Sequence, residues 1–140
     1  MPEKREEFKR VAEALSASPF YRHIRMRITK IEERSSEMWL ELGEEHKNIW
    51  GTIHGGAIAS LLDSTCGSSL YSSLEQNEGA ITIDLRVNFF APPQGSRIIG
   101  KGSFIYRTKR LAWSQAEAYD EKGNLIARAQ AIHRIVKRNW

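Results

Sequence analysis

The chain lacks the cysteines, the long apolar runs and the leader pattern that mark secreted and membrane proteins. Cys66 is the only cysteine among 140 residues, which excludes a disulfide within the chain and is typical of a reducing compartment. No apolar run approaches the ~18–20 residues that cross a bilayer. The first residues, Met1 to Glu7, mix both charges and lack the apolar stretch of a signal peptide. We therefore expect a cytoplasmic protein with no membrane segment.

The chain also lacks a large excess of one charge. The 21 Lys and Arg residues stand against 17 Asp and Glu, which gives a formal net charge of +4, and the two signs are mostly interspersed. Nucleic-acid-binding proteins usually carry a basic stripe with interleaved aromatic residues, so we expect no nucleic-acid partner. The nucleophile elbow, the Walker A loop and the dinucleotide-binding glycine motif are absent. His23, His46, His54 and His133 are isolated in the sequence, so we expect no metal.

The hydrophobic pattern predicts an α+β domain. Apolar residues at helical spacing indicate a helix over 3–16 and a long central helix from 56 to about 74. Period-two alternation and turn residues indicate strands over 24–28, 37–42, 81–89, 97–107, 111–120 and 125–136. This order predicts an antiparallel sheet of about six strands wrapped around one buried helix. Open sheet edges predict a dimer, joined either edge to edge or helix to helix.

The most informative feature is His54-Gly55-Gly56 at the start of the central helix, followed by a lone acid, Asp63, in an apolar run. Backbone N–H groups at a helix start lie at the positive end of its dipole and suit an oxygen that becomes negative. A carboxylate in a helix that otherwise forms part of the core is costly unless it has a partner or a chemical task. Together these groups could hydrolyse an activated acyl compound. The alternatives are a solvent-exposed aspartate and glycines that only permit a turn.

Four further residues are candidates for the site or its surroundings, and two of them, Asn48 and Thr82, have two interpretations each. Asn48 is either an amide that faces the reacting group or a loop asparagine that caps a turn. Thr82 lies, by alternation, on the face of its strand opposite the apolar one, where it could hydrogen-bond a carboxylate or a water, or could be an ordinary strand threonine. His54 is expected to hold the loop or the surroundings of the substrate in place. Cys66 is interpreted as a small core residue.

The pattern Asn48-x-x-Gly51-x-x-His54-Gly55-Gly56, followed by Leu61-Leu62-Asp63, resembles the hotdog-fold acyl-CoA thioesterases, and within them the PaaI-like group. The likeness continues through Thr82 to Phe89 and Ala91-Pro92, and covers roughly residues 20–136. It implies a sheet around a central helix and dimers, or dimers of dimers, with active sites between subunits. We expect one domain over residues 1–140, with the N-terminal helix in 1–19 and the core in 20–136.

The resemblance also implies roles. The Gly55 N–H would polarise the thioester carbonyl, and Asp63 of the other subunit would act as general base or nucleophile. Asn48 and His54 would orient the thioester or the water, and Thr82 would support the carboxylate. Gly56, Ser64, Thr65 and Ser68 are expected beside the substrate. Arg107, Lys109 and Arg110 could contact the phosphates of coenzyme A, or could form a solvated charge run.

The expected function is therefore hydrolysis of an aryl, short-chain or medium-chain acyl-CoA to the free acid and coenzyme A, with no cofactor beyond the substrate's own coenzyme A. The first alternative is a non-catalytic acyl-CoA-binding module on the same scaffold. A hotdog dehydratase or hydratase is the second, and it would pair a histidine with an acid on different elements, which the set Asn48, Gly55 and Asp63 does not match.

Overall fold

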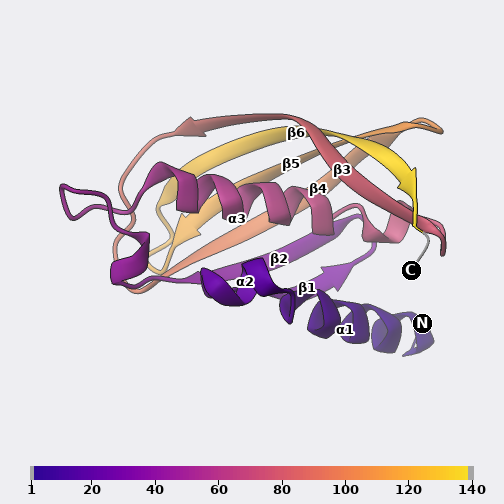
Figure 1. Ribbon diagram of the computed structural model, residues 1–140, viewed down its shortest axis with the longest axis horizontal. Coiled ribbons are helices and arrows are strands. Elements are labelled where there is room, and N and C mark those ends of the chain that lie inside the picture. The colour runs from indigo at the N-terminus through magenta and orange to yellow at the C-terminus, as the bar shows by residue number, and fades with distance from the viewer. Residues whose placement is uncertain (1, 139–140) are drawn as a thin grey trace.

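The computed structural model describes residues 2–138 and consists of one curved sheet, a helix inside its curve and helices at one edge (Figure 1). The helices are α1 (Pro2–Ser16), α2 (Pro19–His23) and α3 (Gly55–Ser68), with short 3₁₀ turns η1 (Glu44–His46) and η2 (Tyr71–Ser73). The strands are β1 (Met26–Glu32), β2 (Ser35–Glu41), β3 (Glu78–Phe89), β4 (Arg97–Arg107), β5 (Leu111–Asp120) and β6 (Leu125–Lys137).

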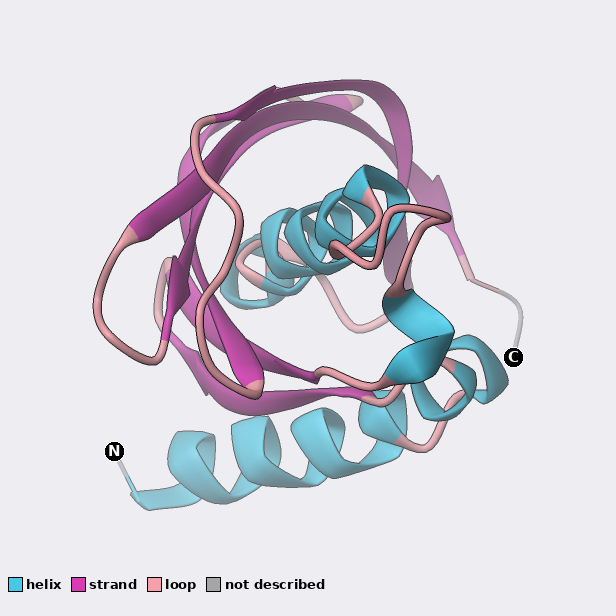
Figure 2. Ribbon diagram, turned by 90° about the vertical axis from the view of Figure 1, so that its left-hand side faces the viewer, coloured by secondary structure: helices cyan, strands magenta, loops and turns pink. Residues whose placement is uncertain are grey.

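All neighbouring strands are antiparallel, in the order β1-β2-β4-β5-β6-β3. Figure 2 shows this sheet curling around α3, which contacts every strand. The predicted α+β architecture is therefore confirmed, including the count of six strands and the central helix. The central helix ends at Ser68, earlier than predicted, because the small residues after Asp63 are weak helix formers and the chain continues into the turn η2.

Small residues let α3 approach the sheet closely. The face of the sheet beneath α3 carries buried alanines on β5 and β6, at Ala116, Ala118, Ala127, Ala129 and Ala131. On β4, a Cβ added to Gly102 would lie 2.5 Å from the backbone oxygen of Thr65 in α3. Glycine within a strand often marks such an approach of another backbone. On β2 and β4 the core is filled by larger buried side chains, such as Met38, Leu40 and Ile98.

The two edges of the sheet differ. The β1 edge is covered by α1, and the Ser16 hydroxyl oxygen accepts the outward N–H of Ile28 at 2.9 Å. The helix α2 follows α1 and is not among the predicted elements; Pro19 occupies its first turn, where proline is favoured. The β3 edge is uncovered within residues 2–138 and presents Ile81 and Ile83, each more than half exposed. Natural proteins rarely leave such a long apolar edge unprotected.

Candidate active site

The start of α3 is organised by His54. This residue is the N-cap of the helix, and its Nδ1 accepts the N–H of Gly56 at 2.7 Å. The backbone N–H of His54 is held in turn by the carbonyl oxygen of the buried His46 at 2.7 Å. The N–H of Gly55 donates no hydrogen bond within residues 2–138. Of the glycine pair, Gly55 therefore keeps a free donor at the positive end of the helix.

Asn48 organises the loop that leads to this helix. Its Oδ1 accepts the backbone N–H groups of Trp50, at 2.9 Å, and Thr52, at 3.2 Å, while its Nδ2 donates to the Thr52 hydroxyl at 2.7 Å. Gly51 takes a positive φ of 81° at the tip of this turn. The structure thus gives Asn48 the turn-capping contacts of the second interpretation, and it shows no hydrogen bond from Asn48 to His54, Gly55 or Asp63.

Asp63 lies half-buried on the face of α3 that the sheet leaves open. The Thr82 hydroxyl donates to its Oδ1 at 2.7 Å, which joins the central helix to the edge strand β3. The Oδ2 atom accepts no hydrogen bond from the described residues, so it is available to a water or a substrate. The structure therefore brings together Asp63 and Thr82, which the sequence separates by 19 residues.

A β-bulge explains how Thr82 reaches Asp63. The register of β3 against β6 shifts between Thr82 and Asp84, so Ile83 is the extra residue. Before the bulge Thr82 faces α3, and after it Leu85 and Val87 contact the core. Strict alternation, which puts Thr82 opposite the apolar face, also predicts Ile81 and Ile83 on the apolar face with Leu85. That interpretation is wrong, because one inserted residue exchanges the two faces of a strand.

His133, which was not among the predicted site residues, lies next to Thr82. His133 of β6 is buried, with Nδ1 3.4 Å from the Thr82 hydroxyl and Nε2 2.9 Å from the Ser114 hydroxyl. Thr82 has one hydroxyl hydrogen, which it gives to Asp63, so it can only accept from His133. A neutral imidazole fits both contacts if Nδ1 carries the proton and Nε2 accepts from Ser114. Alternation along β6, where Ala129 and Ala131 also face inward, was the available signal.

Burial sets the electrostatics around this group. It lowers the pKa of His133, against the opposing charge of Asp63, which agrees with a neutral imidazole. Burial raises the pKa of the Cys66 thiol to about 12, so this cysteine is a core residue and not a thiolate nucleophile at neutral pH. Burial also raises the pKa of Tyr21, while its contact with the Ser64 hydroxyl lowers it and the Asp63 charge raises it further. These effects place Tyr21 of α2 near the same open face of α3.

Two residues expected beside the substrate face the sheet instead. Thr65 is fully buried, its hydroxyl donates to the Leu61 carbonyl oxygen at 2.6 Å, and its own carbonyl oxygen accepts from Ser36 at 2.9 Å. Ser68 is also buried and donates to the Ser36 hydroxyl at 2.9 Å. We correct both expectations, since Thr65 shares the buried helical face of Leu61. Gly56 is exposed and Ser64 is half-buried, so both remain accessible from the open side.

Arg107 is likewise committed elsewhere. Its Nη atoms bind the Glu78 carboxylate at 3.0 and 3.3 Å, and it also donates to the carbonyl oxygens of Ser73, Thr108 and Lys109. These bonds use all five guanidinium N–H groups, so none is left for a phosphate, and we correct that expectation. Lys109 and Arg110 are exposed and form no ion pair with any residue of 2–138.

Gly55 and Asp63 of one protomer lie too far apart for a direct attack by the carboxylate on a carbonyl group that the glycine binds. The two residues are eight positions apart on a single helix, which corresponds to about 12 Å along its axis. A reacting carbon lies within about 3–3.5 Å of both the group that attacks it and the donor that binds its oxygen. A direct attack of this kind would therefore need one of the two residues from a second copy of the chain.

Among residues 2–138, no group of three or more His, Cys, Asp or Glu side chains is arranged to hold a metal ion. In the same part of the chain, no helix is long and apolar enough to cross a membrane.

The fold is that of a thioester hydrolase, as comparison with known proteins shows. The family model of the thioesterase superfamily matches residues 51–127, from the loop before α3 to β6. This is more than half of the chain, and the chain belongs to the thioesterase superfamily. The resemblance to the hotdog thioesterases is thereby confirmed, and the PaaI-like group is consistent with it.

Individual proteins agree with this assignment. The chain is 26% identical over 132 residues to the medium/long-chain acyl-CoA thioesterase YigI of Escherichia coli, covering 84% of this chain and 85% of that one. It superposes on thioesterase HI1161 of Haemophilus influenzae with a TM-score of 0.85 at 14% identity, covering 95% and 92% of the two chains. The protein BH2602 of Bacillus halodurans, whose structure was solved with CoA, gives a TM-score of 0.68 at 23% identity, covering 71% and 66%.

Proposed function

We propose that this protein hydrolyses acyl-CoA thioesters as a homodimer, with Asp63 of one protomer and the Gly55 N–H of the other acting on the same carbonyl group. The observation that carries the proposal is the Asp63 carboxylate, held through Oδ1 by Thr82 on the open face of α3, with Oδ2 unused. The acyl-CoA class is supported by the Escherichia coli relative and by the CoA in the Bacillus halodurans structure.

In this mechanism Asp63 acts as general base. Its Oδ2 takes a proton from a water, and the oxygen of that water attacks the thioester carbon. The carbonyl oxygen becomes negative and accepts a hydrogen bond from the Gly55 N–H, where the helix dipole adds to the stabilisation. When the carbon–sulfur bond breaks, the thiolate of coenzyme A takes the proton from Asp63. A general base of this kind contributes about 10²–10⁴-fold in rate.

The same groups also allow Asp63 to attack the carbonyl carbon directly. That route would form a mixed anhydride and release the coenzyme A thiolate before water hydrolyses the anhydride. In both routes Thr82 fixes the carboxylate through Oδ1 and leaves Oδ2 as the reacting oxygen. Trapping with hydroxylamine separates the two routes if the protein is analysed, because only the anhydride can leave a hydroxamate on Asp63 itself, whereas acyl-CoA reacts with hydroxylamine to an acyl hydroxamate without the enzyme.

The second copy is proposed to join at the β3 edge. This strand is 12 residues long and uncovered, and it carries four exposed apolar side chains along it or just after it, Ile81, Ile83, Phe89 and Phe90. Phe89 also lies against the helix start, since a Cβ on Gly55 would be 3.4 Å from its ring. Antiparallel pairing of two β3 strands would bury these residues and bring the open face of each α3 towards the partner.

The substrate would then lie across the open side of α3. Gly56 and Ser64 are the accessible candidates on this face, and His54 supports the site by capping the helix. Lys109 and Arg110 remain the proposed contacts for the phosphates of coenzyme A, because their charges are unpaired within residues 2–138. Asn48 is proposed to act through the shape of its loop, which sets the path of the chain into Gly55.

The test is release of free thiol from a panel of short, medium, long and aromatic acyl-CoAs. We expect turnover by the wild type, loss of turnover in Asp63→Asn, and an unchanged far-UV circular dichroism spectrum. Asp84→Asn makes the same change at an exposed carboxylate of the edge strand β3, which also carries Thr82; it is the matched control and should retain activity. Full activity of Asp63→Asn would reject the mechanism. Calorimetric binding of acyl-CoA without thiol release from any member of the panel would instead indicate the non-catalytic binding module.

A further inference from the structure

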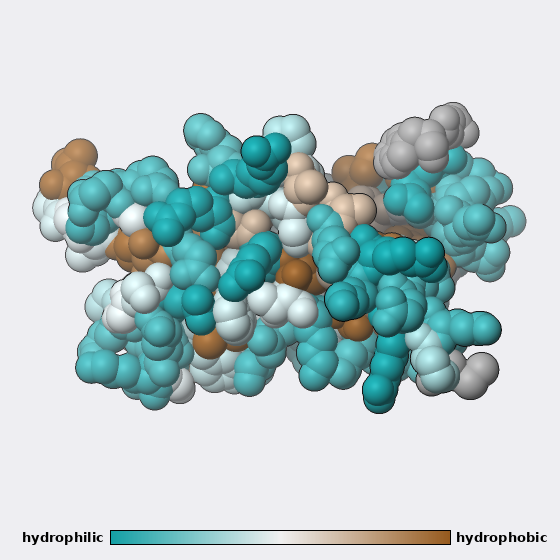
Figure 3. Space-filling view, turned by 90° about the horizontal axis from the view of Figure 1, so that it is seen from below, coloured by the Kyte–Doolittle hydropathy of each residue, from teal (hydrophilic) through white to brown (hydrophobic). Residues whose placement is uncertain are grey.

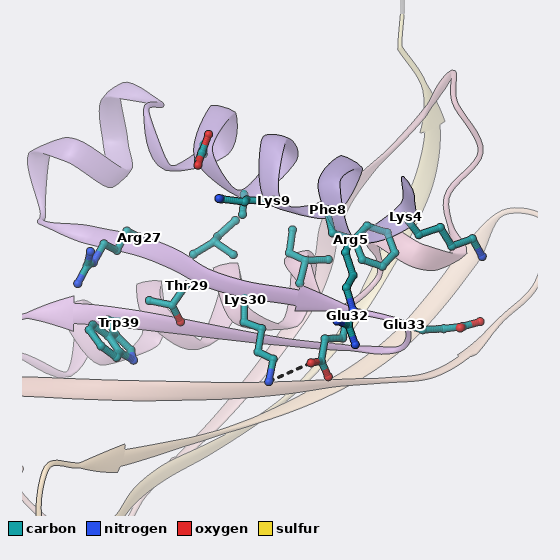
Figure 4. Close-up of a pocket in the computed structure, with 14 residues that line it drawn as sticks. Lys4, Arg5, Phe8, Lys9, Arg27, Thr29, Lys30, Glu32, Glu33 and Trp39 are labelled. Atoms are coloured by element: carbon teal, nitrogen blue, oxygen red, sulfur yellow. Dashed lines mark ion pairs between the residues drawn. The ribbon is translucent and has the colours of Figure 1, made fainter. Parts of the chain in front are cut away.

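A groove lies between α1 and β1, on the opposite side of the fold from β3 (Figure 4). Its volume is about 910 Å³, within the range of small-molecule sites in proteins. Neither Asp63 nor Thr82 lines it. The groove is therefore separate from the candidate active site.

The floor of the groove is apolar. Ala12 of α1 and Ile28 and Ile31 of β1 lie there, each 6% exposed, and the half-buried Phe8 of α1 lies beside them. Phe8 is fixed by an edge-to-face contact with Tyr71, at a centroid distance of 5.7 Å. Trp39 of β2 also lines the groove, beside Arg27. Such a lining favours a hydrocarbon chain or another elongated apolar group.

The rim is rich in cations. Lys4, Arg5, Lys9, Arg27 and Lys30 line the groove, against three carboxylates. Lys30 is paired with Glu32 at 2.9 Å, whereas Lys4, Arg5 and Lys9 form no ion pair within residues 2–138. Figure 4 shows Lys9 and Arg5 on the side of α1 that faces β1. Figure 3, which views this side from below, shows hydrophobic atoms set between hydrophilic side chains.

We propose that the α1–β1 groove binds one molecule of an amphiphilic carboxylate, with its apolar tail over Phe8 and Ile31 and its carboxylate held by Arg5 and Lys9. Apolar lining and unpaired cations on one rim match the two ends of such a molecule. A guanidinium binds a carboxylate through two parallel hydrogen bonds, and the neighbouring ammonium adds a second charge.

Two other occupants fit the groove less well. An extended peptide would need the free backbone groups of the β1 edge, but the outward N–H of Ile28 is already bonded to Ser16. A membrane surface would meet a flat or convex basic face, whereas these apolar residues lie in a recess between a helix and a strand. A single dissolved amphiphile fits both the recessed shape of the groove and the positive charge of its rim.

The probe is dodecanoate below its micelle-forming concentration, added to isotope-labelled protein and followed by amide chemical shifts. We expect saturable shifts at residues of α1 and β1. Acetate, which has the head without the tail, and dodecanol, which has the tail without the charge, should each bind at least about tenfold more weakly. Shifts confined to α3 and β3 would place the ligand in the active site and overturn the proposal.

Neighbouring residues of α1 provide matched variants. Lys9→Glu reverses a charge on the groove, and Arg10→Glu makes the same reversal one residue later, outside the lining. Lys9→Glu should weaken dodecanoate binding by about tenfold or more, and Arg10→Glu by less than about twofold. Equal weakening by the two variants, or binding only to vesicles of anionic lipid, would refute the site. Thiol release from acyl-CoA should be unchanged in Lys9→Glu, so the groove and the proposed hydrolysis can fail independently.

Discussion

The hydrogen bond between Thr82 and Asp63 makes a quantitative prediction. Thr82→Val keeps the shape of the side chain but removes the hydroxyl that donates to Asp63 Oδ1 at 2.7 Å. A hydrogen bond to a charged group contributes about 1.5–3 kcal/mol. If the whole bond is needed to hold the carboxylate in the transition state, kcat falls by about 10- to 150-fold, at 1.36 kcal/mol for each factor of ten. The KM should change little, because Thr82 contacts Asp63 and is not expected to contact the substrate itself.

The assay is steady-state thiol release, with denaturant unfolding measured in parallel. Thr82→Ser is the control, because it keeps a hydroxyl at the same position and should retain kcat within about threefold. Stability should fall by about 1–3 kcal/mol in Thr82→Val, because the buried Nδ1–H of His133 loses its acceptor, while water can replace the lost donor to the half-buried Asp63. The reasoning is refuted if Thr82→Val keeps the wild-type kcat, or if Thr82→Ser loses as much activity as the valine variant.

Three further predictions concern the residues around the site. Gly102→Ala should destabilise the fold by about 1–3 kcal/mol in denaturant unfolding, because the added Cβ would meet the Thr65 carbonyl oxygen at 2.5 Å; unchanged stability would contradict the close packing of α3. Since burial lowers the pKa of His133, stability should be complete above its ordinary value of 6.5 and fall as the pH decreases below it. Melting curves of wild type and His133→Gln should converge as the pH falls from 7 to 5, and parallel curves would argue against a neutral buried imidazole. Arg107→Gln should lower stability by about 2 kcal/mol, through loss of its bonds to Glu78, with no change in KM for acyl-CoA; a raised KM would return Arg107 to the phosphate site.

Most of the element order could be predicted, because hydrophobic periodicity is a local property. The strands β4 and β5 begin and end where alternation places them, at Arg97–Arg107 and Leu111–Asp120. The helix α2 was missed because five residues are too few to show a helical period. The bulge at Ile83 was missed because a single inserted residue leaves the apolar and polar residues of β3 in unbroken alternation along the sequence.

The site shows the same division between local and long-range information. Asp63 and the glycine pair stand out locally, as an acid in an apolar helix and as a helix start. The partner of Arg107 does not, because Glu78 lies 29 residues earlier in the chain and only the fold brings the two together. Thr65 was misplaced for a different reason. It shares a helical face with Leu61, and that periodicity should have outweighed its polarity.

The order of residues His54-Gly55-Gly56 follows from the geometry of the helix start. The imidazole of His54 caps the second glycine, and a Cβ on Gly56 would lie 2.9 Å from its Nδ1, so only glycine leaves room for this cap. The cap uses the N–H of Gly56 and leaves the N–H of Gly55 unbonded. Phe89 limits the space on the other side, since a Cβ on Gly55 would touch its ring at 3.4 Å. Among residues 2–138, one donor of the glycine pair is therefore left unbonded, and the capped helix start holds it in place without support from a substrate.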